Sequence, residues 1–424
     1  MTMIYALILF AVTYVLMLTF TKYRPYIALG SAVVFIATGM LPFDQIFGAI
    51  DWNVLLMIAG TMGLVQLFID SRMPARLADM IMLKVPNVQM AAVALALFAG
   101  IISAFVDNVA TVLMVAPVAL AICKKLKTNP VPFIIGIAVS SNLQGAATLV
   151  GDTTAIMLGS YADMSFLDFF WYKGRPGIFF AVELGAIASA LILAWLFRKE
   201  KDSIEQRGEL TPVTDYVPTV LLVGMIALLI SASFIPVKPA ITNGLICVSL
   251  FVIGMVYTFA RTRSADAFLG PIKSIDFETI GLLFGLFLVI GGITNMGVVD
   301  AAAGLLARMG GGNVFVIYAV LVWASVLFSA FIDNIPYVAT MLPVVTGLAS
   351  TLGIDPTLLY FGLLSGATLG GNCTPIGASA NITGIGILRR EGYEVKTGDF
   401  CRIGIPFTLA AVIPAYIYFW LLYA

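Results

Sequence analysis

Long apolar runs dominate the chain. Eight of them hold 18 to 22 residues each with few charged positions. A helix needs roughly 20 residues to cross the apolar core of a bilayer, which is about 30 Å thick, so each run predicts one transmembrane helix. The runs are 3–20, 25–42, 52–69, 176–197, 217–234, 239–259, 278–297 and 403–423.

Polar residues interrupt the remaining apolar sequence at four places. Two are the related stretches SAFVDNVAT (103–111) and SAFIDNIPYVAT (329–340), each with an Asp-Asn pair in apolar surroundings. The other two, 140–154 and 365–381, are rich in Gly and Thr. Glycine and proline favour unwound backbone, so these sites predict breaks in helices.

The interruptions belong to an internal repeat. Residues 103–156 align with 329–382 at an offset of 226 without a gap, and 16 of the 54 pairs are identical. We therefore predict two related halves, 1–197 and 217–424, joined by the charged linker 198–216.

Composition excludes a soluble globular protein. Of the 424 residues, 61% are hydrophobic and 11% charged, and the mean hydropathy is +1.03. The formal net charge is zero, so the composition has no excess of basic residues, and we expect no nucleic acid partner. The chain has no histidine, so carboxylates must handle any protons within the membrane. We predict an all-α polytopic membrane protein with no cofactor.

The distribution of basic residues predicts the topology, because Lys and Arg concentrate in cytoplasmic loops. If 88–122 and 314–350 are re-entrant hairpins, and 130–160 and 356–388 are interrupted helices that cross once, 19 of the 23 basic residues fall on one side. If the hairpins crossed instead, the division would be 13 to 10. We therefore expect five full crossings and one hairpin per half, both termini outside and the linker in the cytoplasm. An odd number of crossings inverts the second half relative to the first.

Inverted repeats with broken helices are typical of secondary transporters, whose sites form near the midplane where discontinuous elements meet. Non-helical backbone at that depth must line protein or a water-filled cavity. The candidate ion- and substrate-binding residues are Asp107, Asn108, Thr111, Asn142, Thr148, Asp152, Thr153, Asp333, Asn334, Thr368, Asn372, Thr374, Ser379 and Asn381. Among them Asp107, Asn108, Asp333 and Asn334 are the candidate Na+ ligands.

Each candidate also has a structural explanation. Asn108 and Asn334 could cap the second arm of each hairpin. A charge at membrane depth costs from about 2.5 kcal/mol upward, so the carboxylates are harder to explain by capping. Asp152 has Ala378 at the matching position, which leaves ion carrier and helix cap both open. The uncharged Thr, Ser and Asn residues could instead form hydrogen bonds between helices.

The two motifs DNVAT and DNIPYVAT, each followed by a Gly/Thr-rich break, resemble the ArsB/NhaD branch of the ion transporter superfamily, which includes citrate-transporter-like permeases, and most closely its P-protein group. The resemblance implies a homodimer, a scaffold made from the first three spans of each half, and a moving domain made from the hairpins and broken helices. Related sodium-coupled dicarboxylate transporters carry Ser-Asn-Thr at the hairpin tips. Here the tips read Asp107-Asn108-Val109 and Asp333-Asn334-Ile335.

Charge also bears on the substrate. Every Lys and Arg is assigned to a loop, so we expect no fixed cation at the site, which disfavours a bare di- or tricarboxylate. We predict a cation-coupled secondary transporter in the cell membrane, using Na+ or H+, with Na+/H+ antiport as its leading form. Arsenite permeation remains an alternative. So does organic-anion permeation, if bound sodium and helix N-termini supply the field.

Two rivals are weaker. A passive channel would not accumulate substrate. An intramembrane aspartyl protease would use paired carboxylates to activate water, but Asp152 sits in LVGD and lacks the first Gly of the GxGD pattern. We therefore expect no enzyme activity.

The hairpin topology predicts that the loops 72–84 and 124–127 share the cytoplasmic face, although the apolar stretch 88–122 separates them. Single cysteines at Arg76 and Lys125, in a chain without its native cysteines, should react with an impermeant maleimide from the same side only. Labelling of the two positions from opposite sides would refute the first hairpin.

Overall fold

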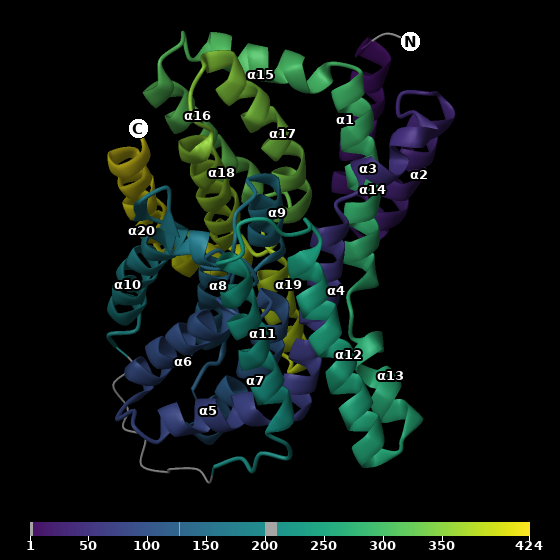
Figure 1. Ribbon diagram of the computed structural model, residues 1–424. Helices are drawn as coiled ribbons and strands as arrows, with labels where there is room; N and C mark the ends of the chain where they lie inside the picture. The colour runs from purple at the N-terminus through teal and green to yellow at the C-terminus, as the bar shows by residue number, and fades with distance from the viewer. Residues whose placement is uncertain (1–2, 127, 200–209) are drawn as a thin grey trace.

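The fold is almost entirely helical, as expected from the sequence. The computed structural model describes residues 3–126, 128–199 and 210–424. The central part of the predicted linker, 200–209, lies outside the described residues. Figure 1 shows the helices as a bundle with α15 at the top of the view and α5 at the bottom.

Helices of the first half follow the predicted runs closely. α2 is the exception: it ends at Ala37, where Gly39 turns the chain with a φ of +74°, instead of continuing to residue 42. In chain order they are α1 (Met3–Thr19), α2 (Arg24–Ala37), α3 (Ile46–Ala49), α4 (Trp52–Asp70), α5 (Met73–Met82), α6 (Val88–Ser103), α7 (Asn108–Leu126), α8 (Val131–Gly145), α9 (Thr153–Tyr161) and α10 (Ile178–Leu196). Short 3-10 turns η1 (Thr21–Tyr23), η2 (Phe43–Gln45) and η3 (Leu167–Phe169) and the two-residue strands β1 (Trp171–Tyr172) and β2 (Arg175–Pro176) lie between them.

The second half repeats this order. Its last helix begins at Thr397, ahead of the predicted run that starts at residue 403. In chain order the helices are α11 (Val217–Ser233), α12 (Thr242–Thr262), α13 (Ala265–Lys273), α14 (Phe277–Asn295), α15 (Val298–Met309), α16 (Val314–Ser329), α17 (Asn334–Leu352), α18 (Thr357–Gly370), the 3-10 turn η4 (Gly371–Cys373), α19 (Ser379–Arg390) and α20 (Thr397–Tyr423).

The repeat extends to the ends of the helices. α16 and α17 have the same bounds as α6 and α7 once the offset of the repeat is applied, and α14 matches α4 in the same way with an offset smaller by one. The second halves of the broken helices, α9 and α19, also begin at matching positions. Related sequences therefore begin and break their helices at related positions. The inversion of the halves across a membrane stays a prediction.

Several helices are long and apolar enough to cross a membrane. Among the described residues seven helices meet this condition, or up to nine spans if two bent helix pairs each count as one. One bent pair is α1 with α2, and the chain bends by 117° between these two helices. The 14 residues of α2 span about 21 Å at 1.5 Å each, which is less than the apolar core of a bilayer. The start of α2 therefore need not reach the membrane surface.

Two glycines allow close main-chain contacts between the halves. α4 packs on α12 and α14 packs on α2, so the third long helix of each half contacts a helix of the other half (Figure 1). A Cβ on Gly60 of α4 would lie 2.5 Å from the main chain of Cys247, and one on Gly285 of α14 would lie 2.7 Å from that of Ala28. Gly60 and Gly285 occupy matching positions of α4 and α14, so both interfaces use the same device.

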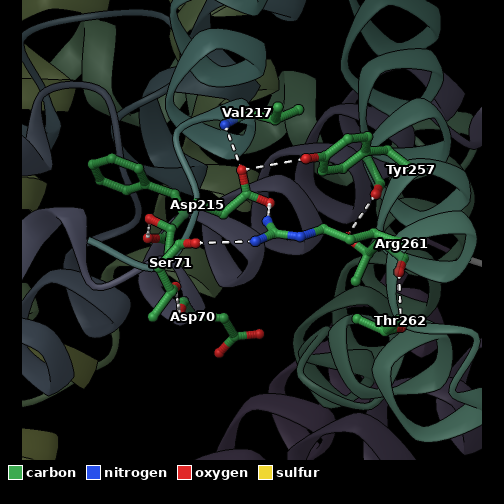
Figure 2. A network of polar contacts seen from close by, with 11 residues as sticks. Asp70, Ser71, Asp215, Val217, Tyr257, Arg261 and Thr262 are labelled. Atoms are coloured by element: carbon green, nitrogen blue, oxygen red, sulfur yellow. Dashed lines mark hydrogen bonds and ion pairs between the residues drawn. The ribbon is translucent and has the colours of Figure 1, made fainter. Parts of the chain in front are cut away.

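A polar network ties the end of the linker to these helices. Asp215 pairs with Arg261 of α12 and accepts a hydrogen bond from Tyr257 at 3.4 Å (Figure 2). Arg261 also donates to the carbonyl of Thr214 at 3.3 Å, and the amide of Thr214 donates to the carbonyl of Ser71 at 3.0 Å, just beyond α4. The chain therefore enters its second half fixed to both α4 and α12.

Gly60→Ala and Gly285→Ala should each force two main chains apart. We expect each to lower the free energy of unfolding by about 1–3 kcal/mol, the usual cost of overpacking, seen as a lower melting temperature in detergent. Gly224→Ala on α11 is the control, because its Cβ would meet nothing within 4 Å. Equal melting temperatures for all three variants would refute the close contact.

Candidate functional site

The two hairpin tips are built in the same way. At the first tip Asp107 accepts hydrogen bonds through Oδ1 from the amides of Val109, at 3.0 Å, and Ala110, at 3.1 Å. At the second, Asp333 Oδ1 accepts from the amide of Ile335 at 3.1 Å. Each carboxylate therefore caps the second arm of its hairpin through one oxygen and leaves the other oxygen for a second partner.

Each broken helix closes directly on its hairpin. The hydroxyl of Thr148 donates to the carbonyl of Ala104, and that of Thr374 donates to the carbonyl of Ala330, at matching positions of the repeat. Gly151 fits against the same hairpin end, where a Cβ would lie 2.6 Å from Ser103 O. These contacts satisfy carbonyls that the hairpin turn leaves free, so Thr148 and Thr374 hold the backbone together.

The two hairpin units meet at a cluster of amides. Asn142 of α8 donates to Thr368 O at 2.7 Å and to Asn372 Oδ1 at 3.0 Å. Asn372 in turn donates to Val139 O at 3.0 Å, and Asn108 donates to Asn142 Oδ1 at 3.0 Å. Asn142, Asn372 and Thr368 are fully buried and bonded to one another. The structure brings these predicted site residues together as a link between the halves.

A cavity of about 140 Å³ lies beside this link. All four chain breaks reach it: the two hairpin tips and the starts of α9 and α19. Residues from the predicted set that line it are Asp107, Asn108, Asp152, Thr153, Asn334 and Ser379. The cavity is therefore the candidate substrate and ion site.

Asp152 stands at the position that would cap α9, yet its side chain makes no capping hydrogen bond. It is 4% exposed and accepts a hydrogen bond from the hydroxyl of Thr154 at 2.7 Å. Thr154 also contacts Thr368 of the other half at 2.9 Å. The contacts of Asp152 therefore do not include those of a helix cap, and its role as an ion carrier stays a prediction.

The expectation that no basic residue reaches the site is wrong for Arg24. Its Nη1 lies 3.3 Å from Asp333 Oδ2, and both side chains are largely buried. Arg24 begins the short helix α2, and its Nε also donates to Met17 O at 3.2 Å. Hydropathy placed Arg24 in a loop because it precedes an apolar run. The bend between α1 and α2 brings that loop to the tip of the second hairpin.

A second, larger cavity has a volume of about 1120 Å³. Part of its lining lies at positions that the internal repeat matches to the lining of the first cavity. The first is lined on α4 by Met62, Val65, Gln66 and Ile69, and the second is lined at the four matching positions of α14 by Phe287, Ile290, Gly291 and Thr294. The second cavity meets the second hairpin at Ala339 and Leu342, beyond its tip. The two cavities therefore have repeat-related lining positions on α4 and α14. The polar hairpin tips line the first cavity.

Three residues of the predicted set, Ser379, Asn381 and Thr111, lie near the breaks. Ser379 donates to Asp333 Oδ2 at 3.3 Å. Asn381 donates to Gly371 O and Thr374 O, each at 3.0 Å, while its own Oδ1 is buried without a partner. The hydroxyl of Thr111 is likewise buried and unpartnered. Within the described residues no group of three or more His, Cys, Asp or Glu side chains could hold a metal ion, so a Na+ site here would combine at most two carboxylates with amide, hydroxyl and main-chain oxygens.

Sequence reasoning missed Asp276 and Gln66 as well as Arg24. Asp276 caps α14 by accepting from Thr279 N at 3.0 Å and lines the first cavity together with Gln66. Asp276 matches Asp51 in the repeat, and each of them directly precedes the third long helix of its half, α4 or α14. This repeated Asp was the signal in the sequence that could have identified Asp276.

A protein-family comparison identifies the chain. The model of the citrate transporter family matches residues 7–364 and 248–424. The chain belongs to this family. Its relatives include an uncharacterized transporter of Mycobacterium tuberculosis (strain CDC 1551 / Oshkosh), 29% identical and covering 99% of both chains, and the 46 kDa membrane protein of Mycobacterium leprae, 30% identical over 99% of this chain and 98% of the relative.

The human P protein is 29% identical over 74% of this chain and 46% of its own length. Among solved structures, the YdaH transporter of Alcanivorax borkumensis has the same fold, with a TM-score of 0.61, 14% identity and coverage of 95% of this chain and 97% of that one. The citrate transporter family member described here is therefore an integral, multi-pass membrane protein and a secondary transporter of a small substrate, and not an enzyme. The predicted resemblance to the ion transporter superfamily and its P-protein group is confirmed.

Asn142→Ala should remove the link between the halves and leave the side-chain NH2 of Asn108 and the Oδ1 of Asn372 without these partners. A buried polar group without a partner costs about 1–3 kcal/mol, so the melting temperature should fall clearly. Asn295→Ala is the control, because its hydrogen bond to Gln45 at 2.7 Å is exposed. If Asn142→Ala melted like the control while ion affinity collapsed, Asn142 would be a ligand and not a structural link.

Proposed function

We propose that this transporter couples substrate movement to a cation, Na+ or H+, by alternating access. The observation that carries the proposal is the pair of carboxylates, Asp107 and Asp152, on one cavity where all four chain breaks converge. Two like charges on one small cavity disfavour each other, so a bound cation or proton stabilises them. Binding Na+ and H+ in alternation on the same carboxylates is an exchange mechanism, so Na+/H+ antiport is its first form.

The two repeat-related cavities support alternating access. A carrier exposes one site to each side of the membrane in turn and needs two conformations of similar free energy. Here the first cavity reaches the tips and the second meets the second hairpin beyond its tip. If the two repeats exchanged conformations, the second cavity would reach the hairpin tips instead of the first. The same site would then open to the other side of the membrane.

Uptake of a citrate-like anion with a cation is the second candidate. Arg24 favours it, because it places a fixed positive charge at the tip of the second hairpin, and the family description names citrate. The N-termini of α7, α9, α17 and α19 at the breaks would add favourable partial charges for an anion. Asp107, Asp152 and Asp276 on the same cavity would then require the anion to enter with cations.

The orientation and assembly belong to the same proposal. The distribution of basic residues supports termini outside and a cytoplasmic linker, and the family resemblance supports a homodimer in the cell membrane. The division into inverted halves at 1–197 and 217–424 is supported by the matching helix bounds.

Asp107→Asn and Asp152→Asn should each abolish ion-coupled transport, because the amide keeps the size of the side chain and loses its charge. Purified variants in proteoliposomes are given an imposed Na+ gradient, and an internal pH dye reports proton exchange. We expect exchange at least about tenfold slower than in the parental protein, equivalent to 1.4 kcal/mol of lost cation binding. The exposed Asp399→Asn is the matched control.

The same vesicles distinguish the substrates. Labelled citrate and arsenite are supplied with Na+, with choline or with a pH gradient. Na+-driven proton exchange without added substrate supports antiport, whereas citrate accumulation that requires a cation supports the second candidate. Parental rates with unchanged ion dependence in both Asp variants would overturn the proposal, and flux without accumulation would indicate a channel.

A further inference from the structure

The tip of the second hairpin differs from the first in what surrounds its carboxylate. Asp107 lines the open cavity, whereas Asp333 Oδ2 faces Arg24 at 3.3 Å and Ser379 at 3.3 Å. Asp333 is 8% exposed, and the Arg24 side chain is 16% exposed. One of the two repeated carboxylates is therefore neutralised by the protein itself.

We propose that Arg24 is a tethered counter-cation that occupies Asp333 when no external cation is bound there and competes with that cation for the carboxylate. This inference rests on the proposed cation coupling and adds a residue to it. Arg24 is the first residue of α2, whereas Asp333 lies at the tip of a hairpin, so the pair joins two elements that a transport cycle would move apart.

The geometry suits a partner that can be displaced. A bidentate arginine–carboxylate pair is strong and fixed, but here one Nη1 meets one oxygen at 3.3 Å. Asp333 Oδ1 is occupied separately by the amide of Ile335, so the cap survives if Arg24 leaves. A small cation could take the place of Arg24 on Oδ2 with Ser379 as a further oxygen ligand.

A neighbouring contact holds the same hairpin without a charge. Tyr14 of α1 donates from its hydroxyl to Pro336 O at 2.6 Å and contacts Thr340 on the first turns of α17. Removal of this hydroxyl alters the packing of α1 on the hairpin while leaving the Arg24–Asp333 pair in place. Tyr14→Phe therefore separates a mechanical role of this segment from an electrostatic one.

Arg24 also explains why a buried carboxylate survives without an ion. An unpaired charge in a desolvated site is strongly destabilising, whereas a paired one is tolerated. If the carrier must return empty after releasing its cation, Asp333 needs a substitute charge during that step. Arg24 supplies it from within the chain.

The test measures cation binding directly, so it does not depend on transport. Purified parental protein, Arg24→Gln, Arg24→Lys and Tyr14→Phe are titrated with NaCl against choline chloride at fixed ionic strength. The melting temperature reports binding. Of the charged side chains, the critical variant changes only Arg24, the ion-pair partner of Asp333.

Arg24→Gln should bind Na+ about tenfold more tightly, seen as a lower Na+ midpoint. Arg24→Lys and Tyr14→Phe should keep midpoints near the parental ones. In an Asp333→Asn background, Arg24→Gln should cause no further shift. If Arg24→Gln is too unstable to titrate, Arg24→Gln/Asp333→Asn should recover a folded protein, because it removes the unpaired charge.

Unchanged or weaker cation binding in Arg24→Gln, or no recovery by the double substitution, would overturn the inference. A tenfold shift in a protein that shows no coupled flux in vesicles would keep Arg24 as the counter-cation of Asp333 and discard the proposed coupling. Coupled flux with unchanged Na+ midpoints would support the proposed coupling and discard Arg24 as the counter-cation of Asp333.

Discussion

The backbone breaks impose the main physical constraint on this protein. Four chain segments leave helical geometry inside an apolar fold, and each frees amides and carbonyls that lipid cannot satisfy. The structure satisfies them in pairs: a threonine hydroxyl of each broken helix bonds the carbonyl at the end of its hairpin, and a glycine lets the two main chains touch. The candidate site forms where these paired breaks meet at the centre of the fold.

A carboxylate at such a break can serve two purposes at once. One oxygen of Asp107 or Asp333 holds the free amides at the start of a helix, which fixes the side chain in place. Its other oxygen is then held in a known direction without further ordering. One oxygen of the side chain therefore has a structural role, and the other is available for the proposed cation, a charge that Ser or Asn could not supply even if it capped equally well.

The sequence predicted the helix bounds and the breaks well, because both depend on local chemistry: apolar runs, Asp-Asn pairs, glycine and proline. It also predicted that the breaks belong to one site, since matching interruptions in two halves indicate a shared place. It could not predict which polar residues satisfy each other. Asn142 and Asn372 are chemically suitable ligands, but their contacts across the two halves make them a structural link. Arg24 was missed because its place depends on the bend between two helices, which hydropathy does not encode.

The glycine contacts at Gly60 and Gly285 have a consequence for how the chain is assembled. α4 finds its partner α12 only after the rest of the first half, the linker and α11 have followed it, and α14 returns to α2 from the opposite end of the sequence. The third long helix of each half thus packs on a helix of the other half, so the halves are interlocked instead of sitting side by side. A single half would complete the same two interfaces only by pairing with a second copy, so the fused chain preserves the geometry of a two-chain assembly within one polypeptide.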